Sequence, residues 1–110
     1  MALALNRFKT YTKELTTSSA TIYTAPTGYT GIILYAHITN YAATVTTLTM
    51  SHVRSSTTTQ IISGAEVPVN DAYIPLDGKL VLETSDYNVA QAGANSKLKI
   101  LVSVLETANA

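Results

Sequence analysis

Nucleophilic catalysis needs a nucleophile, a base beside it and a third group that orients the base. The chain has two histidines, His37 and His52, and no cysteine. Both histidines fall inside predicted strands, and no serine stands in a Gly-x-Ser-x-Gly motif. A histidine on the outer side of a sheet is usually a neutral polar residue. The sequence therefore predicts no catalytic set, and we expect the protein not to be an enzyme.

Metal and cofactor sites have as little support. A zinc site needs three or four ligands, and no carboxylate stands two or four residues after either histidine. A calcium site would need more carboxylates close together, and several of the acids in the second half fall at predicted turns, where Asp bonds backbone amides. These acids are Glu66, Asp71, Asp77, Glu83 and Asp86. We expect no metal ion and no cofactor.

The charge balance narrows the possible partners. Seven Lys and Arg residues against seven Asp and Glu residues give a net charge of zero, which argues against a nucleic-acid binder and favours association with other chains. Arg7, Lys9 and Lys13 form the main basic group, and they either pair with acids of a neighbouring subunit or are simply solvated. The longest apolar stretch, residues 31–36, has the length of a strand, so we expect no membrane span.

These side chains belong to a chain that reads as all-β. Threonine is frequent, and seven tyrosines stand against one phenylalanine and no tryptophan. Short β-type runs alternate with turn signals at intervals of about ten residues, which is typical of a sandwich. We predict an antiparallel β-sandwich of jelly-roll type with about eight strands. It would form a single domain, with an extended N-terminal arm and first strand in residues 1–15 and the sandwich in residues 16–110.

Four patterns make this prediction specific. The longest run, Tyr29 to Asn40, is apolar on both faces, and we expect a central strand covered on each side. A change of phase after Val45 predicts a bulge in the following strand, and Asp77-Gly78 predicts a hairpin. In two strands we expect the following residues to share one face: Ile32, Leu34, Ala36 and Ile38, and then Leu98, Ile100, Val102 and Val104.

Three tyrosines lie at or beside predicted turns: Tyr29, Tyr41 and Tyr73. Tyrosine is favoured at interfaces, because it buries a large ring while its hydroxyl finds a partner. Turn-adjacent aromatic residues also close the ends of sandwiches. Both interpretations stay open.

Several segments resemble a family of small virion proteins of tailed phages. The run Thr21-Ile-Tyr-Thr-Ala-Pro-Thr-Gly28 leads into the long strand that ends in Ile-Thr-Asn40, as in that family. Leu76-Asp-Gly-Lys-Leu-Val-Leu-Glu83 with Ser85-Asp86, and the closing Leu101-Val-Ser-Val-Leu-Glu106, are similar to its later segments. Together these segments cover most of residues 20–106. Ser85 stands where the family commonly has glycine.

The resemblance implies a jelly-roll sandwich located in the virion, assembled in the host cytoplasm, and not an enzyme. In such particles these domains serve as capsid decoration, or cement, proteins. They are usually homotrimers that bind the major capsid protein and bridge neighbouring capsomers. Related sandwiches occur in collars, tail tips and fibre attachments.

A decoration role suggests a use for the segment from Met1 to Tyr11. As an arm that reaches a neighbouring subunit, it would supply apolar anchors and matching charge; these residues are Leu3, Leu5, Arg7, Phe8, Lys9 and Tyr11. The alternative function is attachment or carbohydrate binding by a neck-, tail- or fibre-associated module. That role would use exposed aromatic and amide groups from Asn40, Tyr41, Asn70 and Tyr73.

Overall fold

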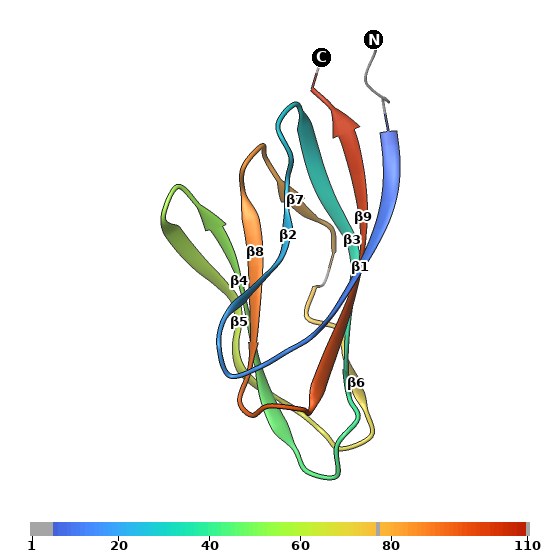
Figure 1. Ribbon diagram of the computed structural model, residues 1–110, viewed down its shortest axis with the longest axis vertical. Helices are drawn as coiled ribbons and strands as arrows, with labels where there is room; N and C mark the ends of the chain where they lie inside the picture. Colours follow the sequence, from blue (N-terminus) through green and yellow to red (C-terminus); the bar gives the residue numbers. More distant parts are fainter. Residues whose placement is uncertain (1–5, 77, 110) are drawn as a thin grey trace.

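The described part of the chain forms nine β-strands in two antiparallel sheets, packed face to face (Figure 1). The computed structural model describes residues 6–76 and 78–109. The strands are β1 (Asn6–Glu14), β2 (Ala20–Thr24), β3 (Tyr29–Asn40), β4 (Thr46–Arg54), β5 (Thr57–Val67), β6 (Ala72–Tyr73), β7 (Leu80–Leu82), β8 (Tyr87–Ala92) and β9 (Leu98–Ala108). The predicted antiparallel sandwich is confirmed. Over the described ranges, the structure has no helix long and apolar enough to cross a membrane.

The two sheets take strands from both halves of the chain. The first sheet has the order β1-β9-β3-β6, with β7 also paired to β3, and the second has the order β2-β8-β4-β5. The pairs are therefore nested: β1 with β9, β2 with β8, β3 with β6 and β7, and β4 with β5. The chain behaves as one long hairpin, turning between β4 and β5, that folds over on itself. This nesting places the first and last strands side by side.

The hairpin expected at Asp77-Gly78 is wrong. Both β6 and β7 pair antiparallel with β3, so they run in the same direction along one edge of it and do not pair with each other. The chain crosses between them where a hairpin was expected, and Asp77 itself lies outside the described residues. The two short strands together occupy one strand position, which explains why nine strands are found where about eight were expected.

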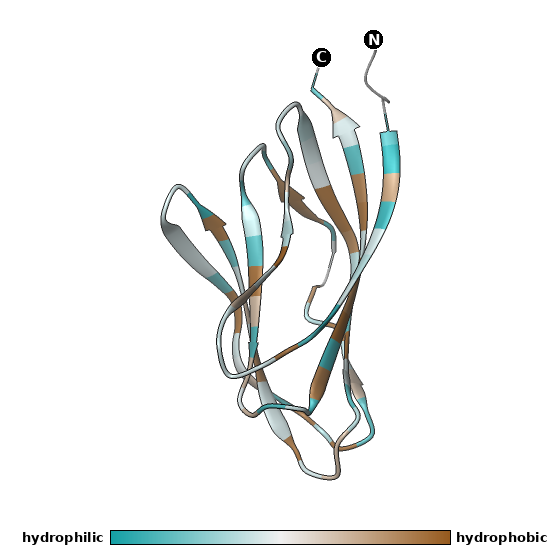
Figure 2. Ribbon diagram, viewed as in Figure 1, coloured by the Kyte–Doolittle hydropathy of each residue, from teal (hydrophilic) through white to brown (hydrophobic). Residues whose placement is uncertain are grey.

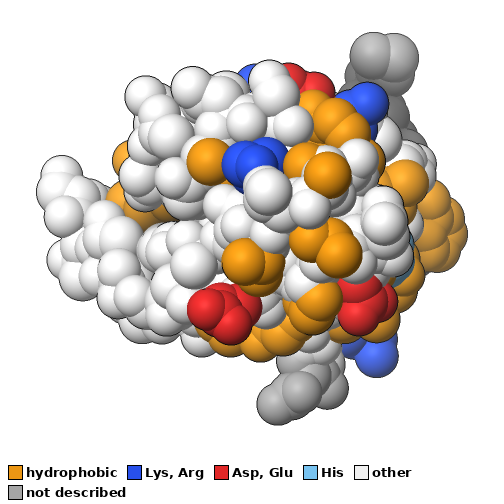
Figure 3. All heavy atoms as spheres, turned by 90° about the horizontal axis from the view of Figure 1, so that it is seen from below, with side chains coloured by type: hydrophobic (Ala, Val, Ile, Leu, Met, Phe, Trp, Pro, Cys, Tyr) orange, Lys and Arg blue, Asp and Glu red, His pale blue; other side chains and the backbone are white. Residues whose placement is uncertain are grey.

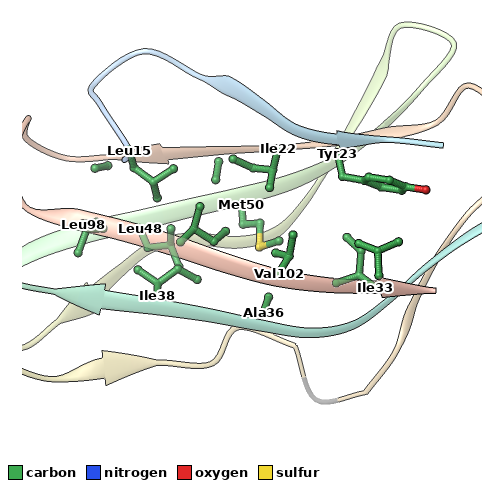
Figure 4. Close-up of a cluster of buried hydrophobic side chains, with 14 of the residues drawn as sticks. Leu15, Ile22, Tyr23, Ile33, Ala36, Ile38, Leu48, Met50, Leu98 and Val102 are labelled. Carbon is green, nitrogen blue, oxygen red and sulfur yellow. The ribbon is translucent and has the colours of Figure 1, made fainter. Parts of the chain in front are cut away.

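The core lies between the sheets, and β9 supplies much of it. Its four predicted inward residues, Leu98, Ile100, Val102 and Val104, are all buried, which confirms that prediction. Figure 4 shows side chains from both sheets meeting there, with Leu48 and Met50 of β4 opposite this layer. Burying each large aliphatic side chain contributes about 1.5–3 kcal/mol, so this cluster is the main source of stability.

The predicted face of β3 is wrong over its first half, because the strand contains a bulge. Ile33 pairs with Val104 and Tyr35 with Ser103, which leaves Leu34 as an extra residue. The inward positions therefore change phase, and Ile33 is buried together with Ala36 and Ile38. Ile32 turns instead to the outer side of the first sheet.

Bulges also interrupt the pairing of β4 with β5, but not at the expected change of phase after Val45, because Val45 lies before β4 begins at Thr46. The register shifts on both sides of Met50, and Met50 and Ser51 are both buried although they are consecutive. β5 continues to Val67 through Ser63-Gly64, where Gly64 adopts a φ of 65° that fits a bulge.

The N-terminal segment contributes an edge strand from Asn6 onward. β1 pairs with β9 along its whole length, from Asn6 opposite Thr107 to Glu14 opposite Lys99. Residues 6–11, which we expected in an extended arm, instead form part of this strand. The pairing satisfies backbone groups along one side of the segment, which a free arm would leave to water.

Candidate interaction surface

The two histidines lie in different sheets, so they do not share a site. The ring of His37 in β3 stacks on Tyr35, with 5.8 Å between the ring centroids. In β4, Nε2 of His52 lies 3.2 Å from Oδ2 of Asp86. Among residues 6–76 and 78–109, no group of three or more His, Asp or Glu side chains is placed to hold a metal ion.

Asp86 is the centre of a polar cluster that joins the two sheets. Arg54 donates to both carboxylate oxygens of Asp86, with distances of 2.7–3.1 Å, and also to Glu83 at 3.0 Å. The backbone N–H of Glu83 donates to Oδ2 of Asp86 at 3.0 Å. The Arg54 guanidinium holds the pKa of Asp86 below its ordinary value, although burial acts in the opposite direction. The cluster fastens the turn before β8 to the end of β4.

A second cluster engages the basic residues of β1. Glu106 of β9 is only 1% exposed, and it accepts hydrogen bonds from Arg7 Nε at 2.5 Å and from the Tyr23 hydroxyl at 2.6 Å. Lys9 Nζ lies 3.7 Å from the same carboxylate. Burial alone would raise the pKa of Glu106, but the hydrogen bonds from Tyr23 and Arg7 outweigh it and lower the pKa.

The contacts of Arg7 and Lys9 with Glu106 bear on the expected pairing of these two residues with a neighbouring subunit. Both were candidates for pairing with acids of a neighbouring subunit, and both have an acid of their own chain beside them. The Arg7 guanidinium also lies 3.9 Å from the centroid of the Tyr29 ring. These charges hold the edge strand in its sheet.

The candidate tyrosines are placed in different surroundings. Tyr29 is buried. Tyr11 packs against Tyr23 in a tilted arrangement, with 5.3 Å between ring centroids and 50° between the ring planes. Tyr73 packs against the core, and Tyr11 and Tyr73 are both half-buried. Tyr41 is exposed, and its hydroxyl donates to Glu14 at 2.8 Å. The described residues do not include Leu3 and Leu5.

Phe8 is the most exposed of the candidate residues, with 74% of its surface accessible. It lies on the outer side of the first sheet and starts a row of apolar residues across four strands. Phe8 stands opposite Leu105, Leu105 opposite Ile32, and Ile32 opposite Val81. Two further exposed residues of the same face, Tyr35 and Leu101, continue the apolar surface. We call these six residues the apolar outer face: Phe8, Ile32, Tyr35, Val81, Leu101 and Leu105.

Of these six residues, only Phe8 was predicted from the sequence to be an interface residue. A signal for the others was present, because β3 is apolar on both sides and the run from Ile100 to Leu105 is nearly all apolar. We interpreted the first pattern as a strand covered on each side. In the part of the chain that the structure describes, the second sheet covers one side of β3, and no further layer covers the other (Figure 1). Figure 2 shows the hydrophobic segments of β3, β7 and β9.

A second group of exposed apolar residues lies at the opposite end of the molecule from the start of β1. The loops at residues 41–45 and 68–71 meet here, and the exposed residues are Tyr41, Val45, Val69 and Ile74. Figure 3 views this end from below and shows hydrophobic side chains with a few charged groups among them. We call these four residues the loop-end surface.

The side chain of Asn40 links the segments at this end through buried hydrogen bonds. It is fully buried, and its amide nitrogen donates to the carbonyl oxygens of Thr44 and Val67, both at 3.0 Å. Its side-chain oxygen accepts from Ala42 N–H at 2.9 Å. Asn40 therefore offers no exposed amide to a carbohydrate, which removes one member of the set proposed for that alternative.

Comparison with known proteins finds similarity at the level of structure. No protein-family model and no curated protein matches the chain. A chain from the acidic stable capsid structure of Helicobacter pylori bacteriophage KHP30 is similar, with a TM-score of 0.57 and 9% identity, over 94% of this chain and 88% of that one. A chain from disulfide-linked pili, the Bacillus endospore appendages, aligns with a TM-score of 0.46 and 9% identity, over 100% and 97%. The first likeness shows a shared fold.

Proposed function

We propose that this chain is a structural virion protein of a tailed phage. Its role would be capsid decoration, in which it binds the outer capsid surface, contacts the major capsid protein and bridges capsomers. The proposal includes association with further copies of itself, and the sequence resemblance implies trimers. It does not include catalysis, because the candidate groups, His52 and Asp86 among them, are engaged in structural clusters.

The main support for the proposal is that a similarity in sequence and an independent similarity in fold both point to a phage particle. Segments spread over residues 20–106 resemble small tailed-phage virion proteins, and the fold is similar to a chain of a phage capsid structure over nearly its whole length. The nested pairing of strands supports the jelly-roll form of the sandwich. Fold alone does not establish function, so the particle itself has to be tested.

The structure suits a part that packs against neighbours. Its net charge is zero, and its exposed apolar residues gather in two places, the apolar outer face and the loop-end surface. Two separate contact surfaces are what a bridging subunit requires, since it must contact a shell as well as a neighbour. The attachment alternative is weaker, because Asn40 is buried and Tyr73 is half-buried.

The deciding measurement is the copy number per virion relative to the major capsid protein, obtained by quantitative mass spectrometry of purified particles. We expect hundreds of copies, close to stoichiometric with the shell protein. A dozen copies or fewer would contradict the decoration role and place the protein at the neck or tail, where the attachment function becomes the better explanation.

The expected arm is tested by a shorter deletion than the sequence suggested. Removing residues 2–11 would remove two thirds of β1 and disturb the first sheet, whereas removing residues 2–5 leaves the described strand intact. If Leu3 and Leu5 anchor the protein, the deletion should weaken binding to particles that lack the protein. A variant with residues 2–5 replaced by glycine and serine is the control for length. Unchanged particle binding by the deletion variant would remove the arm hypothesis.

A further inference from the structure

The outer side of the first sheet is unusual for an antiparallel sandwich. Such a sheet normally packs one face on the core and presents polar residues on the other. Here the cross-strand row from Phe8 through Leu105 and Ile32 to Val81 is apolar on all four strands. Phe8 and Val81, at the two ends of the row, are 74% and 51% exposed. The two middle residues, Leu105 and Ile32, are half-buried, so the row is most accessible at its ends.

On three of its four strands this face lacks charge next to the row. The following outward positions on β1, β9 and β3 carry neutral side chains: Thr10, Ser103 and Tyr35, then Thr12, Leu101 and His37. Beside β7, the exposed Lys79 and Glu83 stand two residues before and after Val81. At the other end of the face, a hollow of about 410 Å³ is lined by Leu101 and His37 together with the charged Lys13, Glu14 and Lys99. A partner that covers the row must itself be apolar over β1, β9 and β3.

We propose that the apolar outer face is covered by another copy of this chain. An identical face suits such a partner, because it is apolar or neutral over β1, β9 and β3 and carries charges of both signs, Lys79 and Glu83, at its β7 edge. An identical chain also presents this face at the same concentration, and the chain has no net charge to oppose association. The proposal rests on the self-association in the proposed function and names its surface. A monomeric isolated chain would overturn it, whereas the copy number per virion tests the decoration role separately.

The size of the face is sufficient for a specific contact. β1 has nine residues, which gives a length of about 31 Å, and four neighbouring strands give a width of about 19 Å. A copy that covered this whole outer side of the sheet, polar positions included, would bury at most about 600 Å² on each partner, at the lower end of the range for specific interfaces. The sequence of β3 agrees, because its apolar residues on both sides are typical of a strand that is covered on both sides.

The test is the mass of the isolated protein in solution, measured by light scattering and sedimentation from about 1 to 200 µM, a range suited to interfaces of this size. We expect the parent chain to form dimers that dissociate on dilution, because a contact between two identical faces closes with two-fold symmetry. The double variant Phe8→Thr/Val81→Thr should raise the dissociation constant about tenfold or more, since exposed anchors are lost. The matched control, Val45→Thr/Ile74→Thr, changes the loop-end surface and should keep the parent mass.

Folding and position are checked separately. Circular dichroism and the urea midpoint of the Phe8→Thr/Val81→Thr variant should match the parent, since both side chains are exposed. The chain has no cysteine, so the rate at which a single introduced cysteine is alkylated reports how accessible its position is. Thr10→Cys probes the outer side of β1, and Thr21→Cys probes β2. Alkylation should slow at position 10 as oligomers form, and stay fast at position 21. A parent chain that is monomeric throughout, or a folded variant that associates like the parent, would overturn the proposal.

Discussion

Arg7 in β1 and Glu106 in β9 are direct cross-strand partners, although 99 positions separate them in the sequence. Their side chains form an ion pair, with 2.5 Å between Nε and Oε1, on the inner side of the first sheet. Tyr23 donates to the other carboxylate oxygen from the second sheet, at 2.6 Å. One buried carboxylate therefore joins the first strand, the last strand and the opposite sheet.

This carboxylate and Asp86 make stability depend on acid. Both have a pKa below the ordinary value, so the unfolded chain binds more protons at low pH. Their contribution is complete above the ordinary values of 4.5 for Glu106 and 3.8 for Asp86, and it is lost as the pH falls through the lower folded values. We expect the urea midpoint, followed by circular dichroism, to be constant from pH 7 to 5 and to fall below pH 4. Glu106→Gln should make this fall shallower, and equal midpoints at pH 3 and pH 7 would contradict the prediction.

Asn40 should be essential to the loop-end surface, whereas a second buried asparagine should not. Asn40→Leu leaves the carbonyls of Thr44 and Val67 and the N–H of Ala42 without their partner, so we expect a loss of about 2–3 kcal/mol in the free energy of unfolding. Asn88 is the matched control, because its buried amide atoms have no hydrogen-bond partner among the described residues. Asn88→Leu should leave the free energy of unfolding unchanged or raise it. Equal losses in the two variants, measured by urea unfolding, would contradict this account.

Gly31 leaves room for the Tyr23 ring. A Cβ atom at position 31 would lie 2.5 Å from Cε2 and 2.6 Å from the hydroxyl oxygen of Tyr23. The ring cannot move freely, because Glu106 and Tyr11 hold it. We expect Gly31→Ala to cost about 1–3 kcal/mol in the free energy of unfolding.

A double-mutant cycle identifies the cause of that loss. In a Tyr23→Ala background the Gly31→Ala substitution should cost clearly less, since the clashing ring is gone. Gly78→Ala is the control, because nothing lies within 4 Å of its Cβ position, and it should change stability little. An undiminished cost of Gly31→Ala without the Tyr23 ring would show that the clash is not the reason.

The turn before β8 should be stabilised by glycine. Ser85 has a φ of 77°, a left-handed conformation that costs a residue with a Cβ about 1–2 kcal/mol. Ser85→Gly should therefore raise the melting temperature, with a gain of up to about 1 kcal/mol, because part of the relief is offset by the larger unfolded-state entropy of glycine. Ser85→Val should lower it. A lower melting temperature for Ser85→Gly than for the parent would contradict the strain argument.

The sequence alone determined the fold class and several elements of this protein. Tyr29–Asn40 was expected as a strand and is β3 with the same bounds, because Gly28, with a φ of 85°, ends the preceding turn. The inward face of β9 was predicted correctly, because Leu98 to Val104 alternate without a break and a pleated strand points alternate residues to one side. These features depend on residues that are near one another in the chain.

The tertiary structure decided the features that depend on distant partners. The bulge at Leu34 reversed the expected face of β3, and no local pattern shows it, because it exists only in the register against β9. The pairing of residues 6–14 with β9 converted most of the expected arm into an edge strand. Asp77-Gly78 has the composition of a hairpin turn, yet its flanking strands both pair with β3, since pairing with a long central strand satisfies more backbone groups than a two-residue turn can.

In the apolar outer face, too, one part was predicted from the sequence and the rest was decided by the tertiary structure. Phe8 was predicted from the sequence as an apolar anchor of the expected N-terminal arm, and in β1 its side chain is exposed. Its neighbours Leu105, Ile32 and Val81 come from three other strands, and only strand order and register bring them into one row. The sequence shows that these residues are apolar. Which side of the sheet they occupy, and that no other part of the described chain covers them, follows from the packing of the two sheets.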